Sequence, residues 1–192
     1  MARLHRSALV VACVACGRHA DPAPPPHVVA ATTDAIHIDG ELSEPSWNQL
    51  GDPQTFTRDG AEARPYSQIR LLHDGDHLYV GLYAADQDIR STERFDLTIG
   101  ALSFSVDPTG RIAPPIRGAH AARDLDGTID APDDEDEEWV IELAIPLAAI
   151  PADVGGEPVT ARASRCDTTK DGVSRCGAWA GSLVLPIATG RR

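Results

Sequence analysis

The chain has 192 residues, of which 42% are hydrophobic, so it can bury the core of one globular domain. Its formal net charge is -12, with 29 acidic against 17 basic residues. A surface of this sign repels phosphate backbones, which argues against a nucleic acid partner and favours a sugar or a divalent cation.

The N-terminus has the pattern of an export signal. Arg3 and Arg6 precede an apolar stretch that is typical of a secretory signal peptide and shorter than the roughly 20 residues that span a bilayer. Small residues before Cys13 and Cys16 resemble the bacterial lipoprotein box. We therefore predict a signal peptide over residues 1–16 with the lipid on Cys16, Cys13 being the alternative, although an ordinary signal cleaved elsewhere also fits.

Residues 17–30 contain the run Ala-Asp-Pro-Ala-Pro-Pro-Pro, which predicts a stiff, extended tether after the anchor. The protein is then expected to be secreted across the inner membrane and held by its lipid in the periplasm or on the cell surface. The folded domain is predicted to cover residues 31–192.

This domain is predicted to be all-β. Apolar and polar residues alternate in short segments, which is the periodicity of strands in a β-sandwich or barrel. Asp74–Gly75 predicts a tight hairpin turn, and Pro45 predicts one helical turn with Trp47 as its apolar residue. The predicted strands are 36–38, 66–73, 77–85, 102–106, 139–145, 159–163 and 182–187.

Two cysteines, Cys166 and Cys176, remain after the signal region. In an oxidising compartment an even pair of cysteines usually forms a bridge. Residues 167–172 read as a turn between two strands, which would bring the two thiols together. We predict a disulfide across this hairpin.

The sequence contains no Gly-x-Ser-x-Gly, His-Glu-x-x-His or phosphate-binding glycine motif, so the chain is not expected to be an enzyme. The acidic run 133–138 predicts a solvated loop. Asp86 and Asp88, at the end of a predicted strand, are candidate ligands for calcium, which prefers carboxylate oxygens. Their alternative role is that of solvated turn residues.

Five segments, taken in order, resemble the carbohydrate-binding module family 9 domain and its family-9-like relatives. The resemblance implies an antiparallel β-sandwich that binds sugars and the ends of plant polysaccharides between two tryptophans, and that carries calcium. The segments are 38–47, 69–82, 104–110, 126–146 and 165–179.

By this resemblance, Trp179 stands where one tryptophan of the sugar clamp belongs. The other tryptophan is missing, Phe95 is the nearest ring, and His73 stands where an aromatic residue is common. The resemblance therefore predicts a non-catalytic carbohydrate-binding module with weak stacking on a polysaccharide or oligosaccharide, of the kind used in polysaccharide catabolism. The alternative is a structural or protein-interaction domain of the envelope that kept the fold and lost sugar binding.

Overall fold

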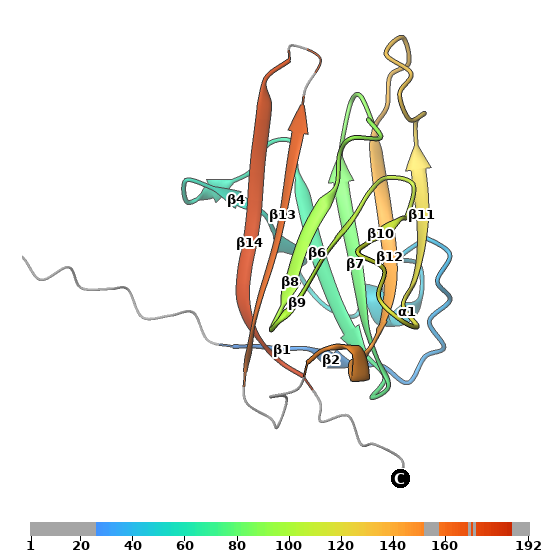
Figure 1. The fold of residues 1–192 in the computed structure, drawn as a ribbon, viewed down its shortest axis with the longest axis vertical. Helices are drawn as coiled ribbons and strands as arrows, with labels where there is room; N and C mark the ends of the chain where they lie inside the picture. Colours follow the sequence, from blue (N-terminus) through green and yellow to red (C-terminus); the bar gives the residue numbers. More distant parts are fainter. Residues whose placement is uncertain (1–25, 152–157, 169, 171, 186–192) are drawn as a thin grey trace, which may run out of the picture.

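The computed structural model describes residues 26–151, 158–168, 170 and 172–185. Two β-sheets pack face to face around one hydrophobic core (Figure 1), which confirms the predicted sandwich. The predicted signal peptide, both candidate lipid-bearing cysteines (Cys13 and Cys16) and most of the predicted tether lie outside the described residues. Within the described residues, no helix is long and apolar enough to cross a membrane.

The first sheet is built around a long antiparallel hairpin. This hairpin consists of β13 (Val159–Thr168) and β14 (Ser174–Val184). β8 (Phe95–Ile99) and β9 (Leu102–Val106) continue the sheet from β13. The remaining strands are short and lie at the two edges: β10 (Ile112–Ala113), β4 (Thr57–Arg58), β5 (Ala61–Glu62) and β1 (His27–Val28).

The second sheet has the order β11-β12-β7-β6-β2, with β3 beside β6. Its central strands β6 and β7 form the predicted hairpin, although three residues, Asp74 to Asp76, connect them rather than two. A short 3-10 helix, η1 (Leu147–Ala149), follows β12. The strands are β11 (His120–Asp126), β12 (Glu138–Pro146), β7 (His77–Ala85), β6 (Ser67–His73), β2 (Ala30–Ala31) and β3 (Gln54–Thr55).

The core lies between the sheets because alternate side chains of each strand point to the same face. On β7, Leu78, Val80 and Leu82 are all fully buried in it. Phe95 of β8 meets Trp139 of β12 across the core, with 4.9 Å between ring centroids. Both sheets therefore contribute large rings to one continuous apolar interior.

A second, smaller cluster covers the outer face of the β6-β7-β12 sheet. The predicted helical turn is confirmed as α1 (Pro45–Asn48), and its Trp47 is fully buried against Leu72 and Tyr79. The Trp47 Nε1 donates to Glu142 of β12 at 3.0 Å. Burial raises the pKa of Glu142 to about 7, although hydrogen bonds, among them that from Trp47, lower it.

Residues 27–31 pair with both sheets. β1 runs parallel to β14, and β2, three residues later, runs parallel to β6. Val29 lies between these strands and is buried in the core. Pairing with the sheets therefore begins at His27, before the predicted start of the domain at residue 31, and the buried side chain of Val29 packs this segment against the core.

Four elements described here differ from the sequence prediction. Residues 36–38 do not form a strand; Ile36 and Ile38 instead pack, partly buried, beside the Trp47 cluster. β8 and β11 were not among the predicted strands. The predicted last strand is longer, since β14 begins at Ser174 rather than at residue 182.

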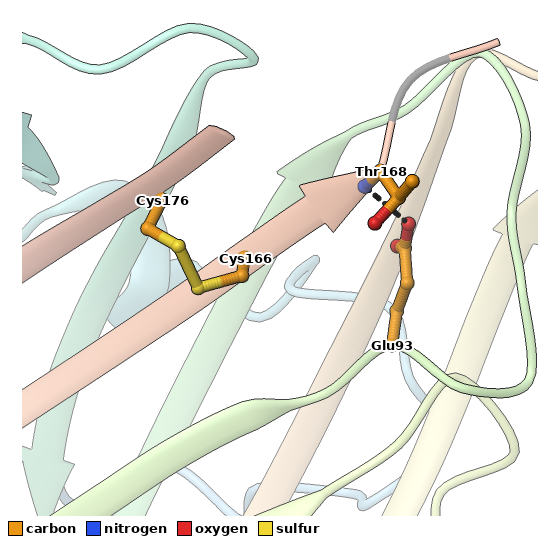
Figure 2. Close-up of a disulfide and its surroundings, with 4 residues drawn as sticks. All are labelled: Glu93, Cys166, Thr168 and Cys176. Carbon is orange, nitrogen blue, oxygen red and sulfur yellow. Dashed lines mark hydrogen bonds between the residues drawn. A yellow bond between two sulfur atoms is a disulfide. The ribbon is translucent and has the colours of Figure 1, made fainter. Parts of the chain in front are cut away.

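The predicted disulfide is confirmed. Cys166 and Cys176 stand directly opposite each other in the antiparallel register of β13 and β14 and are bonded, as Figure 2 shows. Both residues are exposed on the outside of the sandwich. The bridge therefore ties the two hairpin strands together next to their turn without taking part in the core.

Replacing both cysteines by alanine is expected to lower the free energy of unfolding by about 2–3 kcal/mol. The disulfide restricts the unfolded chain, and without it the unfolded chain regains the entropy of the open loop. Guanidinium denaturation of the double variant measures the change. The wild-type chain treated with a thiol reductant is the control and should show the same loss. An unchanged midpoint in both samples would contradict the prediction.

Candidate functional site

A cleft of about 630 Å³ opens at one end of the sandwich. It lies where β7 and β13 end and where β6, β12 and β14 begin, at the upper end in Figure 1. Loops from both sheets form its walls. The lining residues are Arg64, Pro65, Tyr66, Ala85, Asp86, Gln87, Asp88, Glu135, Asp136, Glu137, Asp167, Lys170 and Arg175.

Tyr66 is the aromatic residue of this lining. Its side chain is half-buried, and its hydroxyl forms a 3.1 Å hydrogen bond with the Gln68 Oε1. Its ring meets that of Tyr83 edge to face, with 6.0 Å between centroids. Desolvation on burial raises the pKa of Tyr66, so its hydroxyl stays protonated at neutral pH. These contacts hold the ring in place at the mouth of the cleft.

The exposed part of the lining carries both signs of charge. Glu135 and Glu137 are exposed, while Lys170 donates from its Nζ to the backbone carbonyl of Asp134 at 2.9 Å. Arg64, which also lines the cleft, pairs with Glu62 at 2.7 Å. The cleft therefore presents hydrogen-bond donors and acceptors around one ring.

Beneath the cleft, three carboxyl groups surround one guanidinium. The Arg165 Nη2 lies 2.5 Å from the Asp86 Oδ2, 3.1 Å from the Glu93 Oε2 and 3.7 Å from the Asp167 Oδ1. All four side chains are at most 3% exposed. Trp139 closes the cluster from the core side, with its ring centroid 5.5 Å from the Arg165 Cζ.

The charge state of this acid cluster follows from its burial. Desolvation and a hydrogen bond with Asp86 raise the pKa of Glu93 to about 9, against the opposing effect of Arg165. Burial also raises the pKa of Asp167. Glu93 is therefore protonated at neutral pH, and its Oε1 accepts from the Thr168 backbone N–H at 3.5 Å at the end of β13 (Figure 2).

The three residues expected to bind sugar do not come together. Trp179 is 8% exposed, and Phe95 is fully buried against Trp139 and Phe56. His73 is half-buried at the end of β6 that points away from the cleft. Neither Trp179 nor Phe95 therefore presents an exposed ring to a sugar, and all three tryptophans of the chain are buried.

The physical reason for the buried Trp179 lies in the glycines that flank it. A Cβ atom on Gly181, two residues along β14 and on the same face, would lie 2.9 Å from the Trp179 Cζ2. The ring therefore packs against Gly181, where the side chain of a larger residue would clash with it. The small residue at this position makes room for the Trp179 ring in the core.

Asp86 and Asp88, the candidate calcium ligands, both face arginines. The Asp86 Oδ2 contacts Arg165 and also accepts from the Trp139 Nε1 at 3.1 Å. The Asp88 Oδ2 accepts from the Arg90 Nε at 2.9 Å. Both aspartates follow β7, but each carboxylate binds a different arginine.

Sequence reasoning missed several residues of this end of the molecule. The acidic run 133–138 is mostly exposed, but Asp136 is 2% exposed and accepts from the backbone N–H groups of Ile89 and Thr128 at 2.7 Å each. Nothing in a run of acids distinguishes the buried member. Side chains alternate between the two faces of a strand. If Cys166 points outward, its neighbour Arg165 must point inward, and this was the available signal for Arg165.

The chain matches no protein-family model and no curated protein. Its fold does match solved structures. One is a family 9 carbohydrate-binding module from Caldicellulosiruptor kristjanssonii in complex with glucose, with a TM-score of 0.56 and 15% identity over 86% of this chain and 98% of that one. This chain has the fold of the family 9 modules.

Two further structures agree with this likeness. A Caldicellulosiruptor kristjanssonii family 9 module in complex with cellotriose gives a TM-score of 0.55 at 15% identity, over 85% of this chain and 86% of that one. A candidate carbohydrate-binding protein from Bacteroides uniformis gives 0.52 at 15% identity, over 86% and 92%. At 15% identity these likenesses show the fold alone and not the binding site.

Proposed function

We propose that the chain is a non-catalytic carbohydrate-binding module that holds a sugar in the cleft, against the ring of Tyr66. The observation that carries this proposal is the placement of a fixed aromatic ring among donor and acceptor side chains in a cleft of about 630 Å³. The family 9 fold supports it, because two structures with this fold hold glucose and cellotriose.

Aromatic rings bind sugars through the apolar face of the pyranose, and the surrounding polar groups bind its hydroxyls. Glu135, Glu137 and Lys170 line the cleft beside the ring and can supply such hydrogen bonds. A single ring and a few exposed polar groups give weak binding, with a Kd on the order of 0.1–1 mM.

The acids of the described residues favour binding over hydrolysis. A glycosidase needs a carboxyl group of raised pKa that reaches the glycosidic oxygen. The carboxyl groups whose pKa burial raises here are Glu93, Glu142 and Asp167, and each is at most 4% exposed. Glu93 and Glu142 do not line the cleft. Asp167 does line it, but its side chain is almost fully buried and its Oδ1 lies 3.7 Å from the Arg165 Nη2. None of the three is therefore placed to protonate a glycosidic oxygen.

We further propose that the module is exported and anchored by a lipid on Cys16. The support for this is the N-terminal pattern of a basic segment, an apolar segment and a cysteine. The bridge between Cys166 and Cys176 fits an oxidising compartment.

Replacing Tyr66 by alanine is expected to weaken glycan binding about tenfold, the upper end of what one stacked ring contributes. Retention on insoluble polysaccharides and binding to a glycan array measure the effect, because neither requires the ligand to be known beforehand. Tyr66→Phe should bind nearly as well as the wild type, since it keeps the ring.

Tyr83→Ala is the matched control. It removes the same edge-to-face contact, but Tyr83 does not line the cleft. Equal binding by Tyr66→Ala and the wild type would reject the cleft as the sugar site. Equal loss of binding in Tyr83→Ala and Tyr66→Ala would show that binding depends on the pair of rings and not on Tyr66 alone.

A second candidate function is favoured by the burial of all three tryptophans. A domain that kept the sandwich and lost the two-tryptophan clamp would act as a structural or protein-interaction domain. Failure of the folded wild-type chain to bind any glycan, together with crosslinking to one partner protein in intact envelopes, would support this second function.

A further inference from the structure

We propose that Arg165 is a built-in cation that occupies the place of a divalent metal ion in the acid cluster, so that this domain folds without calcium. The family 9 resemblance implies calcium, and oxygens of Asp86, Glu93 and Asp167 lie within 4.8 Å of one another, a spacing at which three carboxylates can share one ion. The guanidinium of Arg165 contacts all three.

With Arg165 in place, the oxygens of the cluster are not free to coordinate a calcium ion. Calcium takes about six to eight oxygen ligands at about 2.3–2.6 Å. The Asp86 Oδ2 is already bound by Arg165 and by the Trp139 Nε1, and its Oδ1 accepts from the Asp88 backbone N–H at 3.0 Å. The Asp167 Oδ2 is the one cluster oxygen without a partner, and a single free ligand does not make a calcium site.

Electrostatics lead to the same result. A guanidinium cannot lose its proton in a protein, so any ion bound by these oxygens would lie next to a fixed positive charge inside the fold. Both charges would be shielded from water, because the Arg165 side chain is 2% exposed. Repulsion between buried charges is much stronger than at the surface, and Arg165 therefore excludes a divalent ion.

The neighbouring carboxylate is neutralised in the same way. Asp88, the second candidate calcium ligand, binds Arg90, whose side chain is half-exposed. The two carboxylates after β7 are thus each matched by an arginine of this chain. Neither carboxylate is therefore left to bind a metal ion without displacing an arginine.

Two probes test this inference on the full chain: thermal unfolding in EDTA or calcium, and luminescence of Tb³⁺, which takes oxygen ligands as calcium does. Trp139 lies against the cluster, with its ring 5.5 Å from the Arg165 Cζ, and would excite a Tb³⁺ ion bound there. We expect the wild type to show the same Tm in EDTA and in calcium and no tryptophan-sensitised Tb³⁺ luminescence.

Arg165→Met removes the charge and keeps much of the side-chain volume. We expect this variant to melt at a lower temperature in EDTA and to recover about 5–10 °C in calcium at roughly a hundredfold excess over its Kd. It should also gain Tb³⁺ luminescence. Arg111→Met, which breaks the more exposed pair with Asp107, is the control and should gain neither property.

A wild-type Tm that rises in calcium, or wild-type Tb³⁺ luminescence that is lost in Asp86→Asn, would overturn the inference. An Arg165→Met variant that folds but gains no metal response would also overturn the inference. In that case the three carboxyl groups would not form a metal site even without Arg165. If this variant does not fold with or without calcium, the wild-type measurements alone decide the question.

Discussion

Replacing Asp86 by alanine is expected to lower the free energy of unfolding by about 3–5 kcal/mol, because it leaves a buried guanidinium without its nearest anion. The Asp86 carboxylate accepts from Arg165 at 2.5 Å, from Trp139 at 3.1 Å and from the Asp88 backbone at 3.0 Å. Urea denaturation followed by tryptophan fluorescence measures the loss.

Asp96→Ala provides the matched control for Asp86→Ala. Asp96 also pairs with an arginine, Arg94, at 2.9 Å, but both side chains are more than half exposed. Exposed pairs contribute about 0–1 kcal/mol, so this variant should unfold almost as the wild type does. A loss of less than 1 kcal/mol in Asp86→Ala would show that water or another group solvates Arg165 in the variant.

Trp47→Ala is expected to cost a similar amount, about 3–5 kcal/mol, which is typical of removing a fully buried aromatic side chain. The substitution empties the centre of the cluster on the outer face of the second sheet and removes a hydrogen bond from the buried Glu142. Chemical denaturation followed by far-ultraviolet circular dichroism measures the change.

Trp47→Phe separates the two contributions of Trp47. It keeps most of the apolar volume but cannot donate to Glu142, and leaving a buried acceptor short of a partner costs about 1–3 kcal/mol. We therefore expect its loss to be smaller than that of Trp47→Ala. Equal losses would mean that the hydrogen bond, and not the packing of the ring, holds the 36–48 segment on the sheet.

Sequence patterns predicted the central strands of the second sheet better than its edge strand. β6, β7 and β12 bury large apolar side chains on their inner face at every second residue, which gives each of them a strong period of two. β11 lies at the edge of its sheet and no residue in it is fully buried. A strand that buries so little carries almost no periodic signal, which is why β11 was missed.

The candidate site was less predictable than the fold. The family resemblance predicted Trp179 and Phe95 as sugar-binding residues. The direction in which a ring points, however, depends on the strand register and on the space beside the ring, such as the space that Gly181 leaves for Trp179. The cleft is assembled from segments distant in the chain, and Tyr66 and Lys170 come to line the same cleft only in the folded sandwich. Such an assembly leaves no local pattern in the sequence.

The pairing of residues 27–31 with both sheets has a mechanical consequence. A pull on the chain before His27 is carried by β1 into one sheet and by β2 into the other, so that both sheets share the load. These strands lie at the end of the sandwich opposite the cleft (Figure 1). A domain held from its N-terminal side would therefore present the cleft outward. A force on a ligand in the cleft would then be transmitted along the strands to the point of attachment.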